Sequence, residues 1–253
     1  MAQVRGICKL CHKEDLLCES HIIPEYFFTG MYDEKHTALA LSALPYSEGR
    51  IRKGFYDRLL CASCEHFLNS EFETYAIGVW QSQFPGEDHG SGYVMRGLDY
   101  TRFKLFHLSV LWRASVSNRN TFRNVRLGPH EEVIRKMILD KNPGRDDQYT
   151  FYGNYQTFEG DSITYVTEPG PARMEGHKVY VFDFGSCIWR YIVSSHPIGE
   201  IGPFCFNSQG ILLLPKKDIK NDPRLLRITA EARKSDLYRE GDKRHHLIDR
   251  KCA

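Results

Sequence analysis

The chain has 253 residues, of which 42% are hydrophobic and 26% are charged, and its formal net charge is +2. Such a composition can bury one large core or two small ones and is typical of a folded globular protein. No apolar run near Met1 has signal-peptide length and no uncharged apolar stretch reaches the ~20 residues of a membrane span, so we expect neither export nor membrane insertion. Without a secretory signal, the eight cysteines are interpreted as metal ligands and buried thiols of a cytoplasmic protein.

Charge is distributed unevenly along the chain. Residues 101–145 carry ten Lys and Arg against three Asp and Glu, and residues 214–253 carry twelve against seven. Residues 1–100, with nine against 14, and residues 146–213, with three against eight, are acidic. The basic stretches suit a polyanion, because neutralised phosphates supply most non-specific affinity for nucleic acids. A solvated helix face and a charged tail are the alternative interpretation.

The N-terminal third is expected to hold a zinc knuckle, two strands and a helix. We expect the knuckle and a short strand within residues 1–24, and a second strand with its loop within residues 37–60. A helix is predicted over residues 64–81, because Leu68, Phe72 and Val79 recur at helical spacing. The segment before this helix is basic and is predicted to contact a phosphate backbone through Arg50, Arg52, Lys53 and Arg58.

The run Pro85–Gly92 is the clearest interruption and predicts a boundary between residues 1–84 and residues 93–253. Beyond it, a helix is expected around Phe103–Ala114, and another opens at Pro129 and ends before Asn142. Aromatic and β-branched runs then predict an antiparallel sheet, with strands at 149–158, 163–166, 179–184, 188–193 and 211–214. From about Lys216 the chain is a charged tail with one short helix near residues 229–238. The fold class is therefore α+β.

Two Cys-x-x-Cys pairs predict a metal site. Cys8 with Cys11 and Cys61 with Cys64 are four thiols in two knuckles, as a tetrahedral structural zinc requires. The second knuckle leads directly into the predicted helix, which is the treble-clef arrangement. A competing set takes Cys18 and His21 as the partners of the first knuckle and leaves the second knuckle unused.

Between the knuckles lies the segment Ser20–Pro24, with the sequence Ser-His-Ile-Ile-Pro, and the second knuckle is preceded by Leu59 and Leu60. In this order the motifs resemble the HNH endonuclease family, which has a ββα-metal fold. The resemblance covers roughly residues 5–75, and its specificity comes from three elements in the right order. It implies an N-terminal ββα-metal, treble-clef zinc module, followed by a helical segment and an antiparallel sheet of unknown role.

The resemblance also implies metal-dependent hydrolysis of phosphodiester bonds in DNA. In the family the histidine of this segment is the general base, which assigns that role to His21. The knuckles hold structural zinc, and a residue early in the following helix binds a catalytic Mg²⁺ or Mn²⁺ ion. The available helix residues are Glu65, His66 and Asn69, which can share one face.

The sequence departs from the family pattern in three respects. Ser20 stands where a metal-binding acid or histidine is usual, and Glu65 stands where a histidine is expected after the second knuckle. Tyr56 and Asp57 occupy the neighbourhood of the missing middle asparagine. Because Asp57 and Glu65 carry the hard oxygen donors that Mg²⁺ and Mn²⁺ prefer, a rearranged ligand set is compatible with activity.

Two functions are therefore weighed. The first is a DNA endonuclease, with RNA as an alternative polymer, of the kind that the family resemblance places in bacterial and phage restriction and antiviral defence. Residues 93–253 would then act as a DNA clamp, a ligand sensor or a docking surface, and a regulatory protein or a small-molecule activator is expected. The second is a zinc-stabilised module that has lost catalysis and binds nucleic acid or a protein. His21, Glu65 and the basic loop favour the first function, whereas Ser20 and the missing asparagine favour the second.

Overall fold

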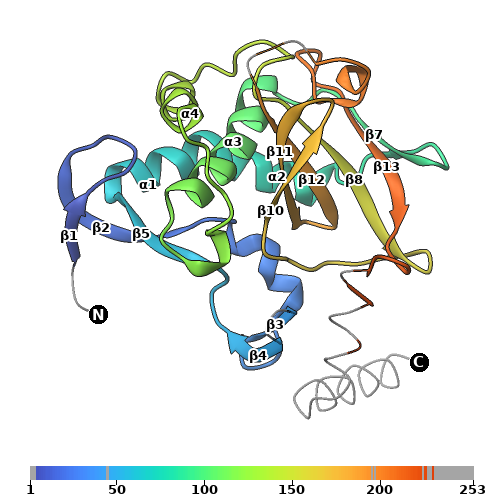
Figure 1. The fold of residues 1–253 in the computed structure, drawn as a ribbon, viewed down its shortest axis with the longest axis horizontal. Helices are drawn as coiled ribbons and strands as arrows, with labels where there is room; N and C mark the ends of the chain where they lie inside the picture. The colour runs from blue at the N-terminus through green and yellow to red at the C-terminus, as the bar shows by residue number, and fades with distance from the viewer. Residues whose placement is uncertain are drawn as a thin grey trace.

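A computed structural model describes residues 4–43, 46–194, 196, 198–223, 225–226 and 230. A small N-terminal sheet and a large C-terminal sheet lie on opposite sides of a group of helices (Figure 1). The predicted helix near residues 229–238 falls almost wholly outside the described residues. The mixture of helices and largely antiparallel sheets confirms the α+β class.

The N-terminal sheet has the strand order β1-β2-β5 and is antiparallel. It is formed by β1 (Val4–Ile7), β2 (Glu14–His21) and β5 (Tyr56–Cys61). Between β2 and β5 the chain forms the 3₁₀ helix η1 (Glu25–Met31) and a hairpin of β3 (Ala38–Ala43) and β4 (Tyr46–Ile51). Residues 37–60 thus hold three strands where the sequence predicted one strand with a loop.

One continuous helical stretch follows β5. It consists of α1 (Ala62–Leu68), the π-helical turn η2 (Asn69–Glu73) and α2 (Thr74–Ser82). The helix predicted over residues 64–81 is therefore confirmed, with a π turn inserted. Such turns widen a helix locally and often lie at functional sites.

The longest helix, α3 (Tyr100–Val116), is buried on every side from Phe103 to Ser115. Its N-terminus is capped by Asp99, whose side chain accepts a hydrogen bond from the backbone of Arg102 at 2.9 Å. After the 3₁₀ turn η3 (Asn120–Phe122), α4 (His130–Leu139) begins directly after Pro129 and ends before Asn142. Both predicted helices are confirmed, and α3 extends beyond its predicted ends.

The C-terminal sheet has the order β10-β11-β12-β8-β13-β7-β6, with β9 paired to β8. Four of the five predicted strands are confirmed, but residues 163–166 form no strand. The β13 strand runs parallel to β8, so the sheet is mixed where an antiparallel one was expected. Its strands are β6 (Glu87–Asp88), β7 (Gly92–Met95), β8 (Phe151–Phe158), β9 (Asp161–Ser162), β10 (Gly170–Met174), β11 (His177–Phe184), β12 (Cys187–Val193) and β13 (Leu212–Asp218).

The hydrophobic core continues across the predicted boundary at Pro85–Gly92. One cluster of buried side chains includes Cys8 in the first knuckle and Leu214 in β13. Phe27 of η1 packs edge-on against Trp80 of α2, with ring centroids 4.9 Å apart, and lies 5.0 Å from Phe184 of β11. The division into domains 1–84 and 93–253 stays a prediction.

Candidate functional site

The two knuckles meet in the structure. Cys8 and Cys11 lie in the turn between β1 and β2, Cys61 ends β5, and Cys64 lies in the first turn of α1. The four sulfur atoms all lie within 4.8 Å of one another. The Cys11 and Cys61 sulfurs are 3.9 Å apart, close to the ~3.8 Å edge of a tetrahedron with ~2.3 Å zinc–sulfur bonds. The four cysteines are therefore placed to bind a metal and are compatible with structural zinc.

The rival ligand set does not assemble. In the part of the chain that the structure describes, the converging group contains neither Cys18 nor His21. Burial raises the pKa of Cys8. Burial acts in the same direction at Cys61, but hydrogen bonds from Ser63, Cys64 and Cys8 together lower the pKa of Cys61 to about 7. The Ser63 hydroxyl lies 3.2 Å from the Cys61 sulfur. A metal ion would hold all four cysteines as thiolates, which are the ligating form.

The first knuckle is tied to two distant elements. The Lys9 backbone donates a hydrogen bond to the Leu59 carbonyl of β5 at 2.9 Å. The Arg135 guanidinium of α4 donates to the Leu10 carbonyl and pairs with Glu132 at 2.6 Å. These contacts fix the turn that presents Cys8 and Cys11.

His21 ends β2 beside a tight turn. Its Nε2 lies 2.9 Å from the Lys53 carbonyl. Since a carbonyl only accepts, in the neutral imidazole Nε2 carries the proton and Nδ1 keeps its lone pair. Gly54 has φ +61°, and a Cβ there would meet the Phe28 ring at 2.7 Å, so this turn requires glycine. The His21 side chain is 25% exposed and lies 3.7 Å from the Glu25 carboxylate. Its imidazole is thus oriented, reachable and able to accept a proton.

Glu65 lies in the first turn of α1, on the side that faces β2 and α3. Burial raises the pKa of its carboxyl, and the nearby Arg113 guanidinium counters part of that rise. Its Oε2 atom is buried, and hydrogen bonding by the Ser20 hydroxyl of β2 further lowers the pKa of the carboxyl. Ser20, which replaces the usual acid, is completely buried next to His21.

A buried ion pair that the sequence analysis missed lies beside these residues. Arg113 of α3 is 0% exposed, and its Nη2 lies 2.6 Å from the Glu73 carboxylate of η2. Its Nη1 donates to the His21 carbonyl at 2.5 Å. The signal in the sequence is an arginine inside the apolar run Phe103–Ala114, a position where a charge must be paired.

The other predicted helix residues face outward. His66 is exposed, and so is Asn69, whose side-chain oxygen accepts a hydrogen bond from the Thr74 hydroxyl at 3.1 Å. The Asp57 carboxylate binds elsewhere: its Oδ2 accepts hydrogen bonds from the Ser117 hydroxyl at 3.0 Å and from the Asn118 backbone. The His21 imidazole is among the groups that lower the pKa of the Glu65 carboxyl, so these two predicted catalytic side chains lie in the same neighbourhood.

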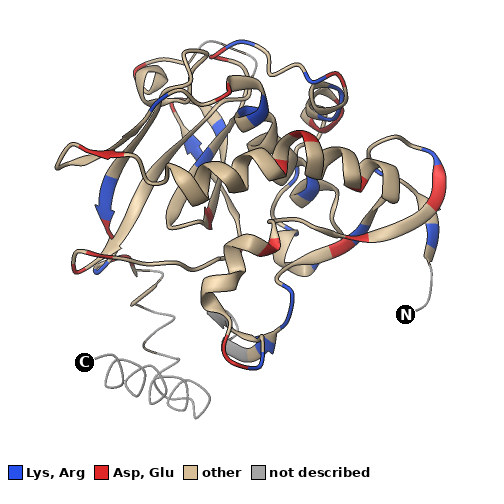
Figure 2. Cartoon of the chain, turned by 180° about the vertical axis from the view of Figure 1, so that it is seen from behind, with Lys and Arg blue, Asp and Glu red and all other residues tan. Residues whose placement is uncertain are grey.

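The predicted nucleic-acid contacts divide into paired and exposed side chains. Arg50 pairs with Asp33 at 2.5 Å, and Arg58 lies 3.6 Å from Glu19 and donates to the Leu17 carbonyl. Arg52 and Lys53 are exposed. Figure 2 shows basic and acidic segments close together on the β3–β4 hairpin and the chain that leaves it. Exposed Arg52 and Lys53 are the more available of the four cations.

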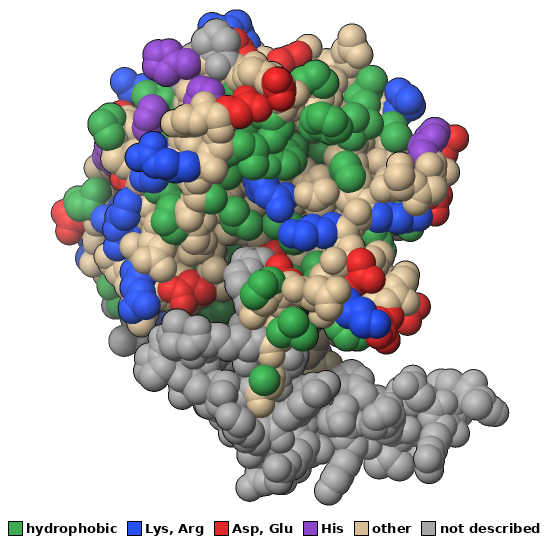
Figure 3. Space-filling model, turned by 45° about the vertical axis from the view of Figure 1, so that its right-hand side comes forward, with side chains coloured by type: hydrophobic (Ala, Val, Ile, Leu, Met, Phe, Trp, Pro, Cys, Tyr) green, Lys and Arg blue, Asp and Glu red, His purple; other side chains and the backbone are tan. Residues whose placement is uncertain are grey.

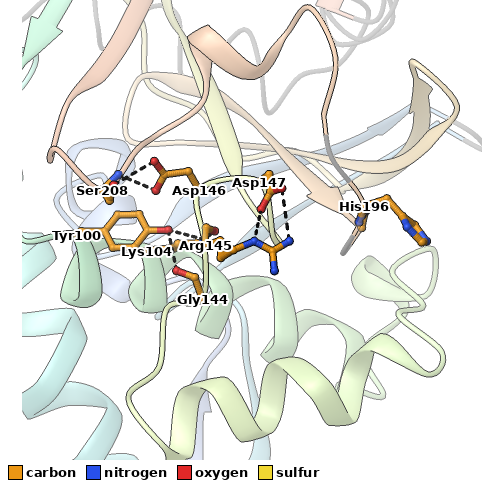
Figure 4. Close-up of polar contacts among 9 residues, drawn as sticks. Tyr100, Lys104, Gly144, Arg145, Asp146, Asp147, His196 and Ser208 are labelled. Atoms are coloured by element: carbon orange, nitrogen blue, oxygen red, sulfur yellow. Dashed lines mark hydrogen bonds and ion pairs between the residues drawn. The ribbon is translucent and has the colours of Figure 1, made fainter.

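A second buried polar cluster surrounds Lys104 of α3 (Figure 4). Its ammonium group donates to the Tyr100 hydroxyl at 2.8 Å and to the Arg145 carbonyl at 2.7 Å. Tyr100 donates in turn to the Gly144 carbonyl, and Asp146 accepts from Ser208. Burial lowers the pKa of Lys104 to about 8, although Asp146 and Asp147 act in the opposite direction. The cluster fastens the loop after α4 to α3.

Because Lys104 is buried in this cluster, we expect the free energy of unfolding to rise as the pH increases above neutrality. The folded-state pKa of Lys104 is about 8, below the ~10.4 of an unfolded lysine, so between these values the unfolded state binds more protons and stability grows with pH. We expect a Lys104→Met variant to lack about 2 kcal/mol of this rise between pH ~7.5 and ~9.5. Urea unfolding of both proteins at the two pH values measures it. Lys136→Met, at a lysine with a 65% exposed side chain, is the control, and equal slopes for the wild type and Lys104→Met would contradict the prediction.

A groove of about 340 Å³ lies on the C-terminal sheet. Figure 3 brings this side of the sheet forward and shows hydrophobic side chains in a hollow bordered by acidic and basic ones. None of the predicted site residues lines the groove, so it is separate from the His21 site. Its lining is aromatic and acidic and consists of Tyr152, Gly153, Asn154, Glu175, Glu200, Ile201, Phe204 and Pro215.

No helix within the described ranges has the length and apolar character needed to cross a membrane. No protein-family model, curated protein or solved structure matches this chain.

Proposed function

We propose that this protein is a metal-dependent endonuclease that hydrolyses phosphodiester bonds in DNA, with His21 as the general base. The observation that carries the proposal is the His21 imidazole, whose Nε2 is held 2.9 Å from the Lys53 carbonyl, so that Nδ1 is left as a proton acceptor. The chain order β2, β5, α1, with four converging cysteines at the junction of β5 and α1, supports it.

In the proposed reaction His21 accepts a proton from a water molecule at Nδ1. The water oxygen forms a bond to phosphorus while the bond to the leaving sugar oxygen breaks, and that oxygen receives a proton from solvent. The Lys53 carbonyl and the Glu25 carboxylate, 3.7 Å from Nε2, stabilise the positive charge that develops on the imidazole. A histidine near pH 7 is suited to this role because it exchanges a proton at low cost.

A Mg²⁺ or Mn²⁺ ion, when bound, would neutralise negative charge on the scissile phosphate. Glu65 is the residue that best fits such an ion, because its carboxylate is a hard oxygen donor close enough to His21 for the imidazole to lower the pKa of the carboxyl. His66 and Asn69 follow on the same helical stretch, but their side chains are exposed, away from the buried Glu65 oxygen, so we do not assign them to the same ion.

Plasmid cleavage with Mg²⁺ or Mn²⁺ tests the proposal. We expect the wild type to nick DNA and a His21→Ala variant to lose at least about a hundredfold in rate, as removal of a general base does. The variant should keep the wild-type zinc content, which metal analysis measures. His89→Ala, at an exposed histidine with a 48% accessible side chain, is the matched control. A His21→Ala variant that cuts at the wild-type rate would contradict the assignment.

A zinc-stabilised binding module without catalysis is the second candidate function. The observation that favours it is Arg113, which pairs with the buried Glu73 and lies close to Glu65. Its guanidinium already supplies a positive charge near both carboxylates. Under this function the wild type would bind DNA or a protein and would not cleave plasmid with either ion.

A further inference from the structure

The connection between α3 and α4 reaches the His21 site, although it lies far along the chain from the knuckles. Asp57 of β5 holds it: the Asp57 carboxylate accepts hydrogen bonds from the Ser117 hydroxyl at 3.0 Å and from the Asn118 backbone at 2.9 Å. The next residue, Arg119, donates from its Nε to the Tyr56 carbonyl. Asp57 therefore positions Arg119 against β5.

Arg119, Tyr56 and His21 form a row. The guanidinium carbon of Arg119 lies 4.8 Å from the centre of the Tyr56 ring, which is a cation–π contact. Tyr56 is the cross-strand partner of His21, and their ring centroids are 6.1 Å apart in an edge-on arrangement. The row thus places a fixed positive charge one aromatic ring away from the imidazole.

The charge of Arg119 is not neutralised locally. No carboxylate of the described residues pairs with Arg119, in contrast to Arg50 and Arg58, which lie 2.5 Å from Asp33 and 3.6 Å from Glu19. The exposed side chains of Arg52 and Lys53 lie on the turn whose carbonyl binds His21. A guanidinium stacked on a ring, with its Nη groups uncommitted to a carboxylate, suits a phosphate oxygen.

We propose that Arg119 binds a DNA phosphate beside His21, so that the α3–α4 connection grips the same strand as Arg52 and Lys53. The inference rests on the proposed function and adds a substrate-binding residue from the C-terminal part of the chain. Arg119 is a binding residue: it holds the backbone in register with the imidazole and transfers no proton.

Binding of a fluorescein-labelled duplex DNA, followed by anisotropy in the His21→Ala background, tests this proposal without cleavage. Adding Arg119→Gln should weaken binding about five- to tenfold near 0.1 M salt and reduce the slope of log affinity against log salt by about one, as loss of one phosphate contact does. Arg119→Lys should restore the slope, because it keeps the charge. An Asp57→Asn change should give a smaller loss of affinity by releasing Arg119.

The matched control is Arg102→Gln. Arg102 also lies over a tyrosine ring, 5.8 Å from the Tyr75 centroid, but it is about 16 Å along α3 from Arg113. We expect this change to leave affinity and salt slope unchanged. If the His21→Ala protein binds DNA and Arg119→Gln keeps its affinity and slope, the role of Arg119 is wrong while the proposed function stands. If the His21→Ala protein shows no salt-dependent DNA binding, both are overturned.

Discussion

A Cys61→Ser variant is expected to lose its metal and to unfold in its N-terminal part at ordinary temperature. Cys61 is 2% exposed and joins β5 to α1, so its thiolate would connect both knuckles through one ion. Structural zinc sites contribute apparent binding free energies of about 10–16 kcal/mol near pH 7, and this energy appears as folding stability. Metal analysis and thermal unfolding, with and without a chelator, measure the effect.

Cys18→Ser is the matched control, because Cys18 is a partly exposed cysteine of the same sheet outside the converging group. It should keep its metal and its melting temperature. If Cys18→Ser instead lost the metal while Cys61→Ser kept it, the site would be the rival one made by Cys8, Cys11, Cys18 and His21. Chelation that left the melting temperature of the wild type unchanged would show that the four cysteines are not a structural metal site.

The parts of the fold that the sequence predicted depend on local patterns. Each Cys-x-x-Cys pair is a short turn, so its chelating geometry can be anticipated without knowing the rest of the chain. The ends of α4 follow from Pro129 before its first residue and from the Asn142-Pro143-Gly144 stop after it. The two knuckles lie about 50 residues apart in the chain. Their paired spacing also predicted that the four thiols come together at one metal site.

The parts that escaped prediction depend on contacts between distant segments. Asp57 looks like a metal ligand in the sequence, yet its carboxylate binds Ser117 and Asn118, about 60 positions away. The parallel pairing of β13 with β8 is a choice among strand partners, and aromatic and β-branched runs carry no information about it. Residues 163–166 have the strand pattern but form no strand. Three of the four are partly buried, and the Thr164 and Tyr165 side chains bond to Ser186 and Gln156, contacts that the local pattern does not show.

The Arg113–Glu73 pair is an ion pair that only the tertiary structure brings together. Its loss should lower the free energy of unfolding. Arg113 is 0% exposed and lies 2.6 Å from the Glu73 carboxylate. In an Arg113→Met variant this carboxylate stays buried without a countercharge, and such changes cost about 3–5 kcal/mol. We expect urea unfolding to show that loss. Since the Arg113 guanidinium also lowers the pKa of Glu65, the variant should raise that pKa further.

A second substitution separates the charge effect from lost packing. Glu73→Gln added to Arg113→Met removes the unpaired carboxylate, so the double variant should recover part of the stability that the single variant lost. Arg102→Met, at an arginine whose side chain is 51% exposed, should change stability by less than about 0.5 kcal/mol. A double variant as unstable as the sum of its singles would mean that the two side chains act independently. Coupling between them would instead show that α3, through Arg113, stabilises the η2 turn that carries Glu73.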